Sequence, residues 1–215
     1  MKYLTILIFA IAFLSCDRTQ KSTLAELENN KVEVKKEIGI PEFTKDKSPF
    51  QSKVPRLAGK DIAFYVEHEA LEEKAQHYYL GIAEASPDAS FMKIFDSLSV
   101  NHNLNPFRWH LLNKAVMNAD GVLAEELSQL VAKKIEVNPQ GFTEMLLDTA
   151  YNGRMEVAKN YAFLLAHDIQ RLEAKKNEKI EDKLIIRAML ACSTCSEKQK
   201  AVLELFFGMV DGLKD

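Results

Sequence analysis

Residues 155–172 read MEVAKNYAFLLAHDIQRL and show the clearest helical pattern in the chain. Their apolar residues recur at alternating spacings of three and four, which places them on one face of an α-helix. They are Met155, Ala158, Ala162, Leu165, Ile169 and Leu172. The same spacing predicts a second long helix over 61–84, from Phe64, His68, Leu71, Ala75, Tyr78 and Ile82. No period-two run of strand length occurs after residue 60, so the predicted fold class is all-α.

Capping residues mark the ends of further helices. Good N-caps precede a proline, or open a capping box, at Ser86-Pro87, Asn105-Pro106, Asn138-Pro139 and Ser196. Glycines break the pattern at Asp120-Gly121 and Asn152-Gly153. These signals predict helices over 61–84, 88–99, 106–118, 122–136, 140–151, 154–177, 181–191 and 197–211. We expect about eight helices in antiparallel hairpins, forming an irregular bundle or a short α-solenoid.

Two of these helix starts, Asn105-Pro106 and Asn138-Pro139, suggest an internal repeat of 33 residues. Each opens a helix, a turn and a second helix. The matched pairs are Trp109 with Phe142, Leu112 with Met145, Val122 with Met155, Leu130 with Phe163, and Val131 with Leu164. The second unit is similar to helix-hairpin repeats of the ankyrin or tetratricopeptide kind, although residues 143–146 depart from the ankyrin motif. A solenoid needs at least about three units. A true repeat and a chance similarity therefore both stay open.

The first sixteen residues form an export signal. Lys2 is a positive n-region, residues 3–14 are almost wholly apolar, and Ser15 is a small residue of the kind that signal peptidases require. The apolar run is shorter than the about 20 residues that span a bilayer. Because the small residue is followed directly by Cys16, the segment resembles the lipobox of bacterial lipoproteins.

This resemblance implies that residues 1–15 are removed as a signal peptide and that the Cys16 thiol is fatty-acylated, for example with palmitate. More than one acyl chain is needed for stable attachment to a membrane. The alternative is an ordinary secretory signal that is cut near Ser15. Both interpretations place the chain in the cell envelope or outside the cell, and the lipidated form would be anchored to the inner or outer membrane with its domain facing the periplasm or the exterior.

Charge is unevenly distributed along the chain. Residues 17–60 are polar and have a net charge of +3, and we predict that residues 16–60 form a flexible tether. Residues 61–215, the predicted helical domain, have a net charge of −7. A domain of this charge repels phosphate backbones, so we expect no nucleic-acid partner. A basic protein partner is one interpretation, and a solvated surface that aids solubility is the other.

Cys192 and Cys195 are the most specific cysteine motif. Two cysteines three residues apart can form a disulfide in an oxidising compartment, and here they would clamp the corner between two predicted helices. A redox-active pair would need a βαβ setting, and a zinc site would need two further ligands. We therefore predict either a structural disulfide or inert thiols at Cys192 and Cys195, with redox activity and metal binding as alternatives.

Possible metal ligands gather on the predicted helix 61–84. Glu69, Glu73 and His77 are spaced at i, i+4 and i+8, and His68 and Glu72 lie beside them. A di-metal site would need a Glu-x-x-His element on a partner helix as well. The alternative is a solvated acidic face stabilised by i,i+4 pairs.

Arg108 and Trp109 lie in a polar, aromatic segment after residue 100. Both residue types are frequent anchors of protein interfaces, so they are candidates for partner binding. The alternative is that Trp109 and Phe107 pack into the helix that follows, as the match of Trp109 to Phe142 suggests. No serine lies in a nucleophile elbow and no triad-like pattern is visible, so we predict no catalytic residues.

These observations predict a non-enzymatic lipoprotein of the cell envelope with an acidic helical protein-interaction domain and no cofactor. Its expected partners are the membrane, through the N-terminal lipid, and an envelope or exported protein. An immunity or inhibitor protein and a scaffold both fit this description. The alternative is a helical domain or enzyme that binds a metal or small ligand through Glu69, Glu73 and His77.

Overall fold

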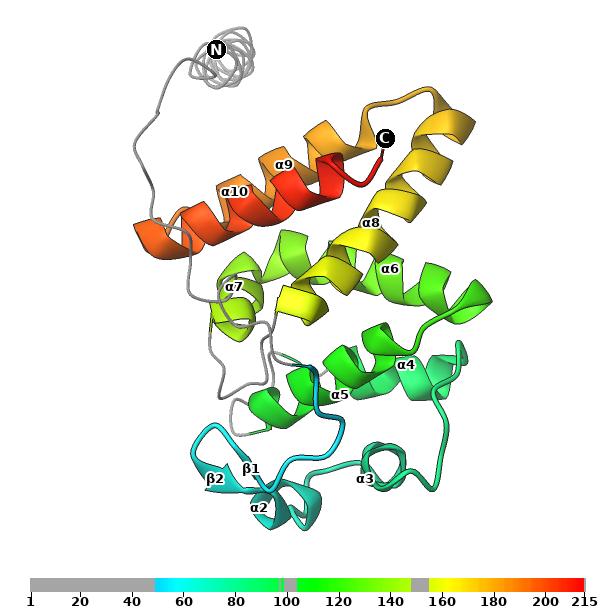
Figure 1. Cartoon of the computed structure of the whole chain (residues 1–215), viewed down its shortest axis with the longest axis vertical. Helices are drawn as coiled ribbons and strands as arrows, with labels where there is room; N and C mark the ends of the chain where they lie inside the picture. Colours follow the sequence, from blue (N-terminus) through cyan, green and yellow to red (C-terminus); the bar gives the residue numbers. More distant parts are fainter. Residues whose placement is uncertain (1–48, 97, 99–103, 148–154, 215) are drawn as a thin grey trace, which may run out of the picture. The chain divides into compact units, whose positions relative to one another are not determined.

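The structure, a computed structural model, describes residues 49–96, 98, 104–147 and 155–214. These residues form nine helices and one two-stranded hairpin (Figure 1). The strands are β1 (Arg56–Leu57) and β2 (Lys60–Asp61). The helices are α2 (Ile62–Val66), α3 (Glu73–Leu80), α4 (Ala89–Asp96), α5 (Asn105–Met117), α6 (Gly121–Val137), α7 (Pro139–Leu147), α8 (Met155–Lys176), α9 (Ile180–Ala191) and α10 (Glu197–Asp211). The predicted all-α class is confirmed. Cys16 and the predicted signal peptide lie outside the described residues.

The C-terminal six helices, α5 to α10, begin within one residue of the predicted starts. Local capping explains this agreement. Asn138 accepts a hydrogen bond from the Gly141 amide at 2.9 Å, and Ser196 forms the predicted capping box with Gln199 at the start of α10. Such interactions involve residues only three apart, so the sequence alone locates them.

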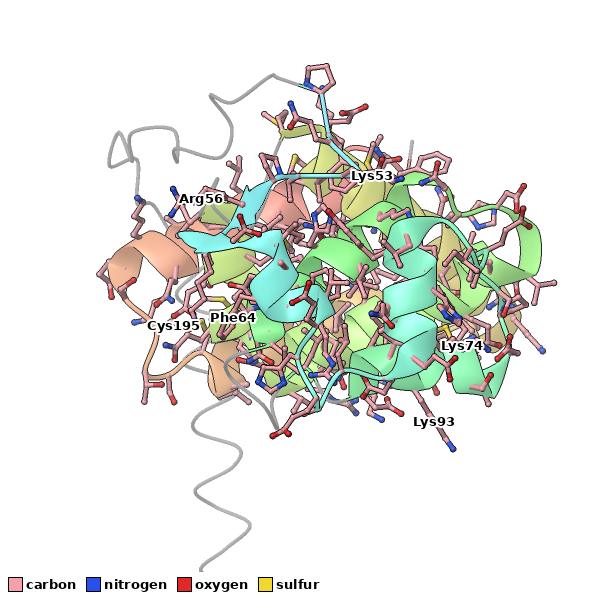
Figure 2. The ribbon with its side chains drawn as sticks, turned by 90° about the horizontal axis from the view of Figure 1, so that it is seen from below. Lys53, Arg56, Phe64, Lys74, Lys93 and Cys195 are labelled. Carbon is pink, nitrogen blue, oxygen red and sulfur yellow. A yellow bond between two sulfur atoms is a disulfide. The ribbon has the colours of Figure 1, made fainter. Side chains whose placement is uncertain are left out.

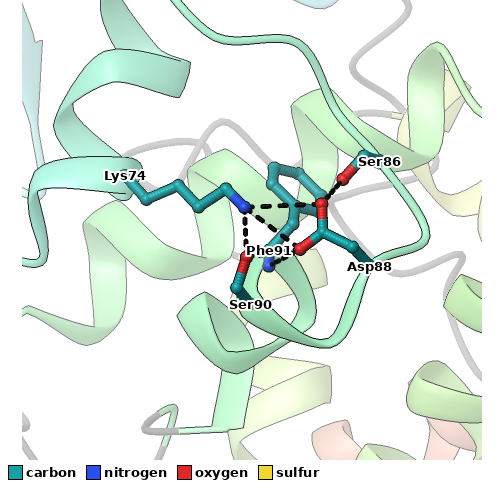
Figure 3. A network of polar contacts seen from close by, with 5 residues as sticks. All are labelled: Lys74, Ser86, Asp88, Ser90 and Phe91. Carbon is teal, nitrogen blue, oxygen red and sulfur yellow. Dashed lines mark hydrogen bonds and ion pairs between the residues drawn. The ribbon is translucent and has the colours of Figure 1, made fainter.

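The start of α4 is capped two residues later than predicted. Asp88, not Ser86, is the N-cap, and its Oδ1 accepts from the Phe91 amide at 2.8 Å (Figure 3). Hydroxyls of Ser86 and Ser90 also donate to the Asp88 carboxylate, and Lys74 Nζ lies 3.1 Å from its Oδ1. These hydrogen bonds hold the Asp88 pKa well below its usual range. The network joins α3 to the first turn of α4.

The predicted helix over 61–84 is wrong, because the chain leaves the helical path between α2 and α3. Asp61 caps α2, and Gln76 of α3 donates to the Val66 carbonyl at the end of α2 at 3.1 Å. In the connection, the Ala70 amide donates to His68 Nδ1 at 3.1 Å. The side chains of His68 and Gln76 therefore satisfy backbone groups that a continuous helix would pair internally.

The predicted tether also extends too far, since residues 49–60 pack against the helices. Leu57 is 2% exposed. Its carbonyl accepts from the Tyr65 hydroxyl at 3.0 Å, and the Val54 carbonyl accepts from the Tyr79 hydroxyl at 3.1 Å. Figure 2 labels Lys53 and Arg56 on this segment and Phe64 on α2. The basic residues of 49–60 thus belong to the folded part of the chain.

Phe142 of α7 is at the centre of an aromatic cluster that joins four helices. Its ring centroid lies 6.3 Å from Trp109 of α5, 5.6 Å from Tyr161 of α8 and 4.9 Å from Phe206 of α10. The Tyr161 hydroxyl also donates to the buried Asn113 side chain of α5 at 2.8 Å. Burial of such rings is the main stabilising contribution to a helical core of this kind.

The internal repeat holds only in part. Trp109 and Phe142 are both buried, as the alignment of the two units requires. Leu130 and Phe163 differ, with 9% and 58% exposure. Helix α6 also packs against α7, α8 and α9, and not only against a neighbouring hairpin. The described helices therefore pack as an irregular bundle.

Candidate functional site

Arg108 and Trp109 do not form a surface site, so their prediction as partner-binding residues is wrong. They are 2% and 4% exposed. Nη2 of Arg108 lies 2.8 Å from both carboxylate oxygens of Glu72. Nε and Nη1 of Arg108 have no hydrogen-bond partner among the described residues. The ion pair between Glu72 and Arg108 instead joins the connection after α2 to the core helix α5.

The three residues of the alternative metal site, Glu69, Glu73 and His77, do not share one helical stripe. Glu69 lies between α2 and α3, so only Glu73 and His77 share a helix. Glu73 Oε1 lies 3.7 Å from His77 Nε2, and the Glu73 side chain is 83% exposed. In the part of the chain that the structure describes, no three His, Cys, Asp or Glu side chains are placed to hold a metal ion.

Cys192 and Cys195 are bonded as a disulfide, with an S–S distance of 1.97 Å. The bond closes the turn between α9 and the Ser196 cap of α10, which is the corner where the sequence predicts it. Cys192 is fully buried and Cys195 is 6% exposed. Buried sulfurs of this kind stabilise a corner and offer no surface for exchange with another thiol.

The corner between α5 and α6 is bordered by two cavities. The helices meet at residues 118–120, and Gly121 begins α6 with a φ of 47°, a left-handed conformation that favours glycine. Met117 and Asp120 line both cavities. We call this region, with its two cavities, the α5–α6 corner.

The first cavity, of about 680 Å³, lies between the segment near Phe50, the end of α3 and the α5–α6 corner. Lys114 lines it, but its Nζ donates to the Tyr78 carbonyl at 2.7 Å and lies 4.4 Å from the centroid of the Tyr78 ring. Burial lowers the Lys114 pKa, and the nearby charge of Lys53 lowers it further. This lysine therefore caps the end of α3 and forms no ion pair with the carboxylates of the described residues.

The second cavity, of about 490 Å³, lies between the first half of α6 and the middle of α8. Phe163 forms part of its wall and is 58% exposed. Asp168 is 5% exposed, and its Oδ1 accepts from Arg171 Nη2 at 2.5 Å. This bond, together with the charge of Asp168, raises the Arg171 pKa.

Carboxylates are the main charged groups among the largely apolar residues that line both cavities. Glu84 and Glu156 line the first, Glu125 and Asp168 line the second, and Asp120 lines both. Lys114 is the one lysine or arginine among these lining residues, which gives them a net charge of −4. Clefts with charge of one sign raise the local concentration of oppositely charged groups. The α5–α6 corner can thus attract a cationic group.

No long-range pattern in the sequence marks this corner. The net charge of −7 over residues 61–215 predicts an acidic surface, but it does not say where the carboxylates gather. Glu84 and Glu156 are 72 residues apart and line one cavity only because α8 packs against α5. The one local signal is the break at Asp120-Gly121, which the sequence does mark.

No protein-family model matches the chain, and neither do any curated protein sequences or solved structures. Among the helices in the described ranges, none is both long and apolar enough to cross a bilayer.

Proposed function

We propose that this chain is a lipid-anchored envelope protein whose α5–α6 corner binds a basic segment of an envelope or exported protein. The observation that supports this most strongly is the lining of the two cavities, whose charged residues are five carboxylates and a single lysine that is already bonded to backbone. The domain has no catalytic role in this proposal.

Electrostatic attraction would govern how such a partner arrives. Complementary charge increases association rates and excludes partners of the wrong sign more than it increases affinity. Exposed carboxylates such as Asp120 and Glu125 would steer the partner, and the apolar walls of the cavities would then be covered. Attachment through Cys16 would confine both proteins to the membrane surface, where an inhibitor or a scaffold needs its partner.

Site-specific crosslinking in cells that produce the full chain tests this proposal. A photoreactive residue replaces Val122, which is 64% exposed on the first turn of α6, beside the α5–α6 corner. A matched probe replaces Leu190, which is 58% exposed on α9. We expect one dominant adduct from position 122 and none of that mass from position 190. The partner in the adduct should contain a segment rich in arginine or lysine.

Charge variants complete the test. The corner variant neutralises three exposed carboxylates: Glu84→Gln, Asp120→Asn and Glu125→Gln. The control neutralises three exposed carboxylates elsewhere: Asp182→Asn, Glu197→Gln and Asp211→Asn. The adduct should decrease at least tenfold in the corner variant and persist in the control. An adduct of equal yield in both variants would refute binding through charge at this corner.

A further inference from the structure

The cavity between α6 and α8 has the features of a receptor for one side chain. It measures about 490 Å³, which is within the usual range of small ligand sites. Three carboxylates line it, and no lysine or arginine does. Building on the function proposed above, we propose that this cavity binds an arginine side chain of the partner's basic segment.

Ser128 is a buried polar residue of this cavity whose hydroxyl has no partner in the described part of the fold. It lines the cavity from α6 and is 1% exposed, yet its Oγ has no hydrogen-bond partner among the described residues. A serine inside a helix commonly bonds to the carbonyl four residues earlier, and this one does not. An unpaired buried hydroxyl destabilises a fold. An incoming N–H donor would remove that penalty.

Other lining groups also offer acceptors. Both hydrogen bonds that Asp168 receives from Arg171 fall on Oδ1, and among the described residues none falls on Oδ2. Asn160 uses its Nδ2 to donate to the Glu156 carbonyl at 2.9 Å, so its side-chain oxygen is oriented away from that bond. Ser128, Asp168 and Asn160 therefore provide oxygens from two helices around one cavity.

Phe163 favours arginine over lysine as the occupant. Its ring is 58% exposed in the cavity wall. A planar guanidinium can stack on such a ring while it donates to several oxygens, whereas an ammonium is a point charge that retains its water more strongly. Arg171, which bonds to Asp168 and lies 3.8 Å from Glu125 Oε2, would act as a positioning residue that fixes the Asp168 carboxylate.

A peptide panel tests the proposal with the full chain in detergent. The probe is fluorescent Gly-Ser-Leu-Arg-Leu-Ser-Gly, and the comparison peptides contain lysine or citrulline in place of the arginine. Citrulline keeps the shape of arginine and removes its charge. Fluorescence anisotropy should show that the arginine peptide binds at least about tenfold more tightly than the citrulline peptide, because a charged hydrogen bond is lost. The lysine peptide should be intermediate.

Two variants locate the binding site, and Ser128→Ala has a second readout that a structural role would not give. Ser128→Ala removes an unpaired hydroxyl, so it should leave the melting temperature of the free protein unchanged or raise it, while weakening the arginine peptide about fivefold. Phe163→Ala should weaken the peptide about three- to fivefold through loss of stacking. The control, Phe64→Ala, removes a ring on α2 that is 42% exposed. It should not change the affinity for the arginine peptide.

The outcomes separate this inference from the proposed function. The arginine site is overturned if the arginine and citrulline peptides bind with equal affinity. It is also overturned if neither Ser128→Ala nor Phe163→Ala weakens binding of the arginine peptide. If the crosslink at position 122 still depends on the corner carboxylates in that case, the proposed function stands without it. Binding of free arginine amide as tightly as the peptide would also overturn the inference, because the occupant would then be a small molecule and not a protein segment.

Discussion

Replacement of Glu72 by alanine should strongly destabilise the protein, although almost half of this side chain is exposed. Glu72 supplies both acceptors, at 2.8 Å, for the guanidinium of Arg108, which is 2% exposed. Nε and Nη1 of Arg108 already lack partners among the described residues. Glu72→Ala would therefore leave a buried cation with none of its donors paired to a carboxylate.

The magnitude follows from the burial of the two partners. Removing one member of a buried ion pair costs about 3–5 kcal/mol. The Glu72 side chain is 45% exposed, so solvent screens the pair. We therefore expect a loss of about 2–4 kcal/mol in the free energy of unfolding, which lowers the Tm of a domain of this size by about 5–15 °C.

Urea unfolding of the full chain measures this loss, with the fluorescence of Trp109, the single tryptophan, as the signal. Trp109 follows Arg108 in the sequence and is itself buried, so its emission reports on the same helix. The control is Glu73→Ala. It removes the same charge from the next residue, whose side chain is 83% exposed. This control should change stability by less than about 0.5 kcal/mol.

A double variant separates the loss of charge pairing from other effects. Arg108→Met combined with Glu72→Ala removes the buried cation as well, and it should recover part of the stability lost in Glu72→Ala. A Glu72→Ala variant no less stable than Glu73→Ala would contradict this prediction, since Arg108 would then gain nothing from its partner.

Three further predictions concern pH, the disulfide and a helix cap. Burial lowers the pKa of the His110 imidazole to about 4, whereas the unfolded chain binds this proton near pH 6.5. As the pH falls the unfolded state is protonated first, so about 3 kcal/mol of stability, present above pH 6.5, should be lost between about pH 6.5 and 4. Urea unfolding at pH 7 and pH 5 should show about 2 kcal/mol of this loss, and His110→Gln, but not the exposed His167→Gln, should reduce it. Replacement of both Cys192 and Cys195 by alanine should lower the free energy of unfolding by about 2 kcal/mol, because the disulfide closes a short loop. Dithiothreitol should lower the melting temperature of the unaltered protein but not that of this variant. An equal effect of dithiothreitol on both would contradict the bond. Asn138→Ala removes the cap of α7 and should cost about 1 kcal/mol in the same unfolding assay, with no change in peptide binding.

Local signals explain how much of the fold was predictable. The starts of α7 and α10 depend on Asn138 and Ser196, whose partners lie three residues away. The apolar stripe of α8 was likewise correct, with Ala158, Ala162 and Leu165 all buried. Capping and periodicity are properties of neighbouring residues, so one sequence is enough to find them.

Tertiary partners explain the errors. The break after α2 is stabilised by Glu72, which bonds to Arg108 across 36 residues. A single sequence gives no sign of that pairing, so the periodic stripe alone predicts a helix that continues through the break. Arginine is seldom buried, so the residue type of Arg108 alone indicates an interface. The cavity between α6 and α8 combines residues from both helices, and no local pattern marks Ser128 as a buried hydroxyl without a partner.

The intact mass of the mature polypeptide tests the membrane placement on which partner binding depends. In the full chain isolated from the membranes of producing cells, we expect a polypeptide that begins at Cys16 and has the additional mass of two or three acyl chains. Cys16→Ser should abolish both the added mass and the membrane association. An unmodified polypeptide that retains Met1 and is recovered from the soluble fraction would contradict the anchor and the envelope location together.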